Sequence, residues 1–210
     1  EETNFSTPTT TLTINGGGGR DKVTIQGPIA LGAAALLVTA EEIVVMGSIT
    51  TTGNVTLTAS DSISGGIGGG ALACAVNALF DATSGKGTSA LTENLGTHCS
   101  KASVTLDGGS ISGATVAVSA TSTATPDAAA VLVPRSDATI ELKGASSITA
   151  TGNVSLTAAS TIGLNVTRDN LLVVVGLSGA SVEVAGSSSV SAGGTLTMSS
   201  TSTINNGSGG

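Results

Sequence analysis

Apolar residues recur along this chain with a fixed period of 20 residues. The segment from Val23 to Ile43 aligns without a gap with the segment from Ile43 to Ile63, and Leu37 then lies on Leu57. A fixed period of this length is typical of stacked-repeat architectures, in which each repeat buries its apolar side chains against its neighbours. The pattern therefore predicts a rod built from similar layers.

Within one period, apolar and polar residues alternate over short runs that glycine separates. Ile43 and Val45 belong to one run, and Val55 and Leu57 belong to the next. Such alternation predicts short strands with side chains pointing alternately inward and outward. The same strand pair returns in SVTLDG…ATVAVSA, TIELKG…NVSLTAA and SVEVAG…TLTMSST. Because every repeat runs the same way round, neighbouring strands must pair in parallel. We therefore predict an all-β fold, a single-stranded parallel β-helix or β-solenoid.

The period can be followed along most of the chain. Coil starts counted from Val23 to Ile204 give about nine coils of about 20 residues. At about 4.8 Å between paired strands, these coils would stack into a rod on the order of 40 Å long. The two gaps on either side of Val104 are each close to two periods long, so we expect the repeat to continue through them.

We expect one β-solenoid domain, or a fragment of a longer one, over residues 1–210. A strand-like run and a glycine-rich turn occupy residues 1–22. Residues 64–101 are expected to form coils decorated with a Cys-bearing insertion loop, and residues 102–210 to form regular coils. Two of the four prolines fall in residues 123–137. Proline is poorly tolerated inside a sheet, which predicts a second projecting loop there.

Composition limits both the interior and the partners. Hydrophobic residues make up 40% of the chain and aromatic residues only 1%, which favours a narrow core of β-branched and small side chains between strands. The net charge of −7 disfavours nucleic acid and anionic membrane surfaces as partners. No window of 18 apolar residues occurs, so we expect no membrane insertion. The chain begins EETNFSTPTT, which predicts a mature or excised fragment.

The period also places four acidic residues in one column. Asp21, Glu41, Asp61 and Asp81 are spaced by 20 residues, and Lys101 follows at the next position. Stacked carboxylates repel each other unless water screens them or a cation lies between them. Carboxylate and carbonyl oxygens are the ligands that calcium prefers, so one hypothesis is a calcium site on this column. The alternative, which we favour, is a solvated charged corner that keeps the rod soluble.

A glycine-rich segment lies beside the start of that column. Residues 16–24 (GGGGRDKVT) match the calcium-binding nonapeptide of β-roll proteins at every fixed position. Such sites are assembled between consecutive copies, and this chain carries one copy. We therefore favour a glycine turn between two strands.

Cys74 and Cys99 are the only cysteines, and both fall in the irregular segment. In a chain with extracellular character, an even cysteine count favours a disulfide. The bond would close the intervening loop and contribute about 3 kcal/mol. The alternative is two small buried thiols. His98 is the only histidine, so a zinc site or a nucleophile pair at Cys99 would lack partners.

Sequons of the N-x-S/T type occur at Asn4, Asn54, Asn153, Asn165 and Asn206. Asn54 and Asn153 lie in the same turn of equivalent coils, in TGNVTL and TGNVSL, where the chain enters a strand. These two residues and Asn165 are the candidate glycosylation sites, and glycans there would point outward. Asparagine also suits a turn or a stacked ladder, which is the alternative interpretation.

A catalytic site needs titratable groups that converge in a cleft. Arg20, Arg135 and Arg168 each lie near an aspartate, but they do not share a column. We interpret them as ion pairs near turns and expect the protein not to be an enzyme. A carbohydrate-active β-helix enzyme remains the alternative.

Ice binding is another alternative, because some β-solenoids present flat T-x-T arrays. Thr56 and Thr58 make one such pair, but the period places Leu36 and Val38 at the equivalent positions of another coil. The array is therefore interrupted, which disfavours this function.

Several phrases resemble a known style of repeat. TGNVTLTAS, GASSITATGNVSLTAAS and GSSSVSAGGTLTMSSTSTI are similar to the β-helical repeats of very large secreted bacterial proteins. Filamentous-haemagglutinin-like adhesins and autotransporter passenger domains are the nearest comparisons, and the likeness covers roughly two-thirds of the chain. The resemblance implies a right-handed parallel β-helix at an extracellular or cell-surface location.

The expected function is structural and adhesive. The resemblance implies a stalk, a fibre or an adhesive surface, either as one segment of a giant adhesin or as a subunit of a filament. The N-terminal TPTTTLTI and the C-terminal STINNGSGG carry no obvious cap, and open strand edges must be capped or paired. Expected partners are therefore another copy stacked end to end, or more of the same giant chain. Surface polysaccharide or a host-cell receptor would be the ligand of an adhesive surface.

Overall fold

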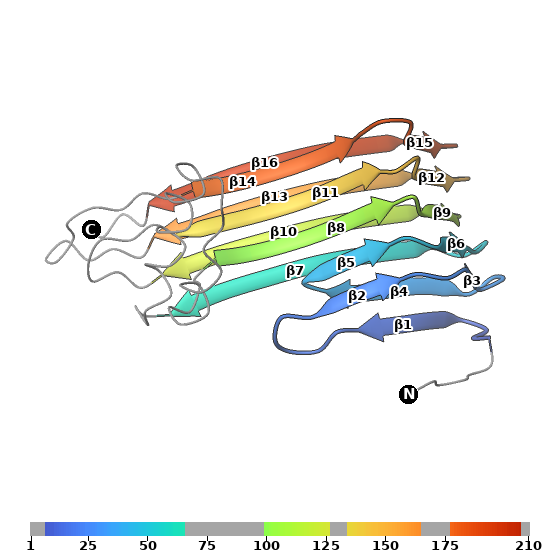
Figure 1. Cartoon of the computed structure of the whole chain (residues 1–210), viewed down its shortest axis with the longest axis horizontal. Coiled ribbons are helices and arrows are strands. Elements are labelled where there is room, and N and C mark those ends of the chain that lie inside the picture. The colour runs from blue at the N-terminus through green and yellow to red at the C-terminus, as the bar shows by residue number, and fades with distance from the viewer. Residues whose placement is uncertain (1–6, 66–98, 127–133, 165–176, 207–210) are drawn as a thin grey trace, which may run out of the picture.

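The computed structural model describes residues 7–65, 99–126, 134–164 and 177–206, and within these ranges all regular structure is strand. The strands form three sheets, and within each sheet neighbouring strands are parallel (Figure 1). Sheet A contains β1 (Thr11–Asn15), β4 (Ala35–Ala40), β7 (Val55–Gly65), β10 (Val116–Pro126), β13 (Val154–Leu164) and β16 (Leu196–Asn206). Sheet B contains β2 (Lys22–Ile25), β5 (Glu42–Val45), β8 (Cys99–Asp107), β11 (Arg135–Lys143) and β14 (Leu177–Val184). Sheet C contains β3 (Ile29–Ala30), β6 (Ser48–Thr50), β9 (Ser110–Gly113), β12 (Ser147–Ala150) and β15 (Ser189–Ala192).

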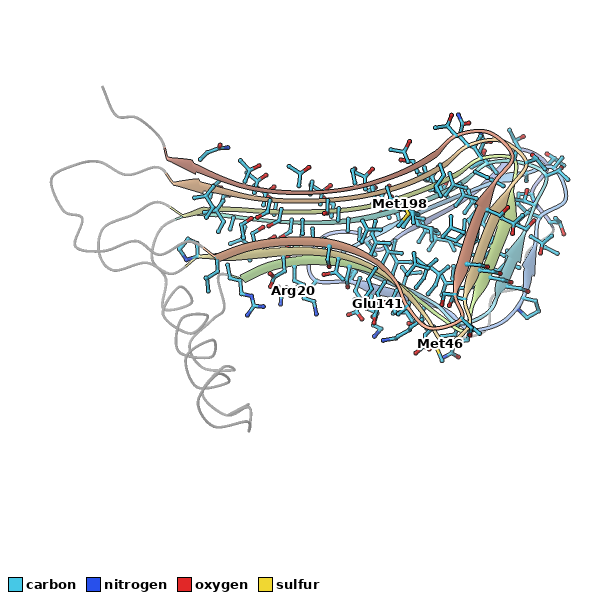
Figure 2. The ribbon with its side chains drawn as sticks, turned by 90° about the horizontal axis from the view of Figure 1, so that it is seen from above. Arg20, Met46, Glu141 and Met198 are labelled. Atoms are coloured by element: carbon cyan, nitrogen blue, oxygen red, sulfur yellow. The ribbon has the colours of Figure 1, made fainter. Side chains whose placement is uncertain are left out.

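Each coil passes through sheet B, then sheet C, then sheet A, and the next coil stacks on it in parallel. Sheets A and B are the long walls, and the short sheet C joins them at one side (Figure 2). The predicted all-β parallel β-helix is therefore confirmed as an architecture. No helix in the part of the chain that the structure describes is long and apolar enough to cross a membrane.

The described residues hold five complete coils and one additional strand, fewer than the about nine coils expected. The register gives the reason. Ile43 pairs directly with Val104, and Val104 pairs directly with Ile140. The sheet A and sheet C strands of these coils pair in the same order. No coil therefore lies between these paired strands, so the expected stacking of further coils at the long gaps is wrong. Residues 66–98, with the expected Cys-bearing loop, lie outside the described residues.

The coils have two sizes, which produces a step in the rod. The sheet A and sheet B strands are short up to β5, with six residues in β4 and four in β5. From β7 onward they are long, with 11 residues in β7 and nine in β8. The pairing of β4 with β7 ends where Ala40 lies on Ala59, so the rest of β7 extends beyond the coil beneath it (Figure 1).

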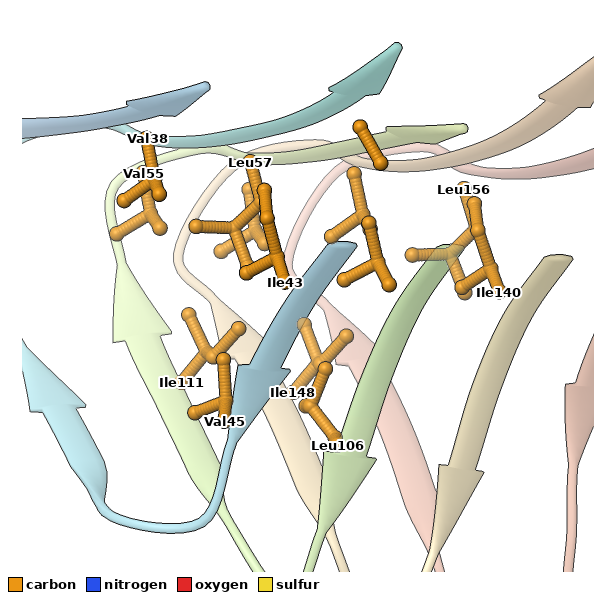
Figure 3. Packing of buried hydrophobic residues seen from close by; sticks show 14 of the residues in the cluster. Val38, Ile43, Val45, Val55, Leu57, Leu106, Ile111, Ile140, Ile148 and Leu156 are labelled. Atoms are coloured by element: carbon orange, nitrogen blue, oxygen red, sulfur yellow. The ribbon is translucent and has the colours of Figure 1, made fainter. Parts of the chain in front are cut away.

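The core is a set of aliphatic columns that run along the rod. One column stacks Ile43, Val104 and Ile140, and another stacks Leu57, Val118 and Leu156 (Figure 3). These side chains are fully buried or nearly so. The space between facing sheets admits side chains of this size at every layer, which accounts for the lack of aromatic residues.

One turn changes the register that the sequence period predicted. Ala30 pairs with Thr50, as a 20-residue period requires, but Leu36 pairs with Val55 and Leu37 with Thr56. The turn that leads into β4 is therefore one residue longer than the turn that leads into β7. A slip of one residue reverses which face a side chain occupies. Leu37 consequently points outward, and the expected alignment of Leu37 on Leu57 is wrong.

In the elongated part of the coils, buried serines form a hydrogen-bonded ladder beside buried aliphatic residues such as Ile162. Ser136 Oγ donates to Ser122 Oγ at 2.8 Å, and Ser122 Oγ donates to Ser100 Oγ at 2.7 Å. Higher up, Ser160 Oγ donates to the Ser136 carbonyl at 2.7 Å and is hydrogen-bonded to Ser178 Oγ. This serine ladder alternates between sheets A and B. It gives each buried hydroxyl a hydrogen-bond partner.

We expect Ser122→Ala to lower the free energy of unfolding by about 1–3 kcal/mol, because Ser136 Oγ then loses its acceptor in a buried site. Ser119→Ala is the matched control, since Ser119 lies on the same strand but faces outward, and its loss should stay within about 0.5 kcal/mol. Urea denaturation followed by circular dichroism measures both. Equal losses would contradict a role for the ladder.

Candidate functional site

The acidic column folds into a mixed-charge cluster at the step. Asp61 lies on the inner face of the β7 extension and is only 8% exposed. The Lys101 backbone N–H donates to Asp61 Oδ2 at 2.7 Å, and the Arg20 guanidinium contacts the same oxygen at 3.4 Å. Asp61 thus links the end of β7 to β8 in the next coil and to the glycine-rich turn that precedes β2. Its charge is compensated in place.

Asp21 and Glu41 meet in a different way. The Asp21 backbone N–H donates to Glu41 Oε2 at 2.8 Å, so one acidic side chain accepts a hydrogen bond from the backbone of the other residue. Asp21 Oδ2 is buried and has no hydrogen-bond partner. Lys22, Glu42 and Lys101 line the open pocket beside this pair. The column of like charges that the sequence predicted is therefore interleaved with cations.

The calcium hypothesis gains no support from this geometry. Within the described ranges, no group of three or more His, Cys, Asp or Glu side chains is arranged so that it could hold a metal ion. Asp81 lies outside the described residues. The favoured alternative, a charged corner, agrees with the ion pair between Arg20 and Asp61, and calcium stays a prediction.

The glycine-rich segment is a turn between two strands, as favoured. β1 ends at Asn15 and β2 begins at Lys22. Gly17 and Gly19 adopt positive φ angles of 101° and 129°, which glycine reaches without strain. The turn brings Arg20 beneath the extension of β7, so its glycines serve to position that side chain.

Several predicted site residues lie outside the described part of the chain. These are Cys74, His98, Asn165 and the pair Arg168 and Asp169. Cys99 is the first residue of β8. The disulfide and a glycan on Asn165 therefore stay predictions.

The two remaining sequon asparagines occupy equivalent corners, as the sequence predicted. Asn54 immediately precedes β7, and Asn153 immediately precedes β13. Asn54 Oδ1 accepts a hydrogen bond from Thr115 Oγ1 at 2.9 Å, and Asn153 Oδ1 accepts one from the Thr195 N–H at 2.8 Å. Each asparagine thus joins its coil to the coil above. Both residues are exposed, and their glycosylation stays a prediction.

Two of the three arginines near an aspartate lie in the described ranges, and both make ion pairs. Arg135 pairs with Asp137 on the same strand, which confirms a local ion pair. Arg20 also contacts Asp61, which belongs to a coil above it, and separation along the chain did not indicate this pairing.

The last coil presents its core side chains to solvent. Met198 pairs with Leu156 in register, yet Met198 is 44% exposed and Leu156 is fully buried. Figure 2 shows Met198 between the two long sheets, where a core side chain belongs. Leu196, Ile204 and Val184 are exposed in the same way. This surface, the end face, is an uncovered layer of the core with open strand edges.

The two long walls differ in chemistry. The outward side chains of sheet B include many charged groups, among them the pairs Lys22 with Glu42 and Lys143 with Glu141. The hydrogen bond from Lys143 Nζ to Glu141 raises the pKa of Lys143. Among the described residues of sheet A, by contrast, no outward position carries a charge, and most are Thr or Ser.

Besides the charged cluster at the step, the end face and the outer face of sheet A are surfaces with a distinctive chemistry. In comparisons with family models, with curated proteins and with solved structures, nothing matches this chain.

Proposed function

We propose that this protein is a structural and adhesive β-solenoid, which acts as a stalk or filament segment by stacking coil on coil. The observation that carries the proposal is the end face. Its apolar side chains continue the buried columns of the rod, and burial of such side chains would contribute roughly 1.5–3 kcal/mol each. Another coil of the same kind is the surface that fits them.

The open backbone edge supports the same conclusion. β14, β15 and β16 are the terminal strands of their sheets, so each offers unpaired N–H and C=O groups along one side. At the opposite end, Leu12, Ile14, Val23 and Ile29 are only partly buried. A second copy, or more of the same giant chain, would satisfy both ends. We expect the coils to be right-handed, as parallel crossover connections almost always are.

An extracellular or cell-surface location is part of the proposal. It is supported by the repeat style, by the cysteine pair in the sequence and by the exposed sequons at Asn54 and Asn153. An adhesive segment of this kind would present its walls to surface polysaccharide or to a host-cell receptor.

The stacking prediction concerns Met198. We expect the 210-residue chain to form end-to-end assemblies as its concentration rises, and Met198→Glu to prevent them, because a carboxylate would then have to be buried between two coils. Ser199→Glu is the matched control, since the neighbouring side chain faces outward and should leave assembly intact. Size-exclusion chromatography with light scattering and electron microscopy measure the assemblies. A native chain that stays monomeric at every concentration would contradict end-to-end stacking.

A further inference from the structure

The outer face of sheet A carries a regular array of hydroxyl groups, which we call the hydroxyl face. It consists of the outward side chains of four long neighbouring strands, which pair in one continuous register. The positions on each strand are Thr56, Thr58, Ser60 and Ser62 on β7; Ala117, Ser119, Thr121 and Thr123 on β10; Ser155, Thr157, Ala159 and Thr161 on β13; and Thr197, Ser199, Thr201 and Thr203 on β16.

The array repeats in two directions. Thr123 pairs with Ser62 below and with Thr161 above, and Thr161 pairs with Thr203, so hydroxyls follow one another from strand to strand. Strand pairing sets a spacing of about 4.8 Å across the strands, and alternation sets about 6.7 Å along them. The hydroxyls make few and long contacts with each other, such as 3.4 Å between Ser119 and Thr58. Most of their hydrogen-bonding capacity therefore points to solvent.

The chemistry of this face excludes most partners. It carries no charge among its described positions, so it offers no ion pair to a charged ligand. Its described positions are all Thr, Ser or Ala, so the face has no aromatic ring on which a sugar could stack. Each threonine presents a methyl group beside its hydroxyl, and its χ1 angle is restricted because Thr is β-branched. The face is thus an uncharged, rigid lattice of hydrogen-bonding and methyl groups.

We propose that the hydroxyl face binds the surface of ice. Ice is an uncharged partner that presents its own hydrogen-bonding groups in a two-dimensional lattice, and a rigid periodic array can hold water in register with it. The strand register places different residues on this face from those that the 20-residue period predicted. Leu36 and Val38 point into the core, and Thr39 is the residue that pairs with Thr58. Leu37 points outward beside Thr56, so the uninterrupted part of the array begins at β7.

This inference does not rest on end-to-end stacking, because the hydroxyl face runs along the side of the rod and the end face lies across its axis. Stacking of copies would lengthen the face without covering it.

Thermal hysteresis, the gap between the melting and freezing points of an ice crystal in the protein solution, tests the proposal. We expect the native 210-residue chain to produce hysteresis and to shape ice crystals. Thr121→Lys should abolish both effects, because a long, strongly hydrated cation would stand above the centre of the face. Thr139→Lys is the matched control, since Thr139 faces outward on sheet B, and it should retain native hysteresis. Circular dichroism establishes that both variants fold.

A second variant works in the opposite direction. Ala159→Thr completes the row of Ser60, Thr121 and Thr201, and we expect it to increase the hysteresis. A folded native chain without hysteresis, or an equal loss in both lysine variants, would overturn the proposal. If Thr121→Lys instead abolishes a dimer while the native chain shows no hysteresis, the partner of the face is a second copy and the proposal also fails.

Discussion

Leu156→Ala is expected to destabilise the rod by about 2–5 kcal/mol, the range found when a fully buried leucine is truncated and leaves a cavity. Leu156 is 0% exposed and lies between two other members of its column, with Val118 below it and Met198 above it. The coils around it are fixed by parallel pairing on both sides in all three sheets. They therefore cannot collapse into the space left behind, and the loss should fall in the upper part of the range.

Leu37→Ala is the matched control for this prediction. Leu37 has the same side chain and belongs to the same sheet, but it points outward. We expect its truncation to cost well under half as much. Thermal or urea unfolding measures both variants, and a similar loss in the two would show that the register of β4 against β7 is not the one described.

Gly47→Ala is the second change with a large expected effect. A Cβ atom on Gly47 would lie 2.2 Å from the carbonyl oxygen of Gly27 in the coil below. Gly47 cannot move away easily, because its N–H donates to the Ile25 carbonyl at 2.9 Å and its carbonyl accepts from the Ser110 N–H at 3.1 Å. Overpacking a well-ordered site costs up to about 3 kcal/mol, and a clash with backbone belongs at that upper end.

Gly27→Ala supplies the control, since Gly27 occupies the same corner one coil lower. A Cβ atom there would meet no atom within 4 Å. We expect its stability to stay within about 0.5 kcal/mol of the native value. Comparable destabilisation by both substitutions would mean that glycine is required at this corner for its backbone conformation and not for the close approach of two coils.

Much of the fold could be predicted from the sequence, because strands that stack in parallel repeat the same pattern of apolar residues along the chain. Val23, Ile43, Val104 and Ile140 lie in one column in the structure, as the recurrence of apolar residues indicated. The turn asparagines Asn54 and Asn153 also lie where the pattern placed them.

The candidate sites were less predictable, because their contacts depend on turns and on strand pairing. The acidic column was identified, but its pairing with Arg20 depends on a turn that passes beneath the extension of β7. The serine ladder crosses between two sheets at unequal chain separations of 14 to 24 residues, so it leaves no fixed period. The sequence shows the alternating Thr and Ser of the hydroxyl face. Which of them lie side by side depends on how neighbouring strands pair.

The sequence by itself determined that this chain forms parallel coils with an aliphatic core, because an inward side chain must meet a similar one in every layer. Tertiary structure alone decided how many layers there are, where the step falls and which hydroxyls line up. Those features depend on turn lengths. A turn can gain one residue, or a gap can hold more than 30 residues as it does between Gly65 and Cys99, without altering the strands on either side. A change of one residue reverses the face that every following side chain occupies until the next turn compensates for it.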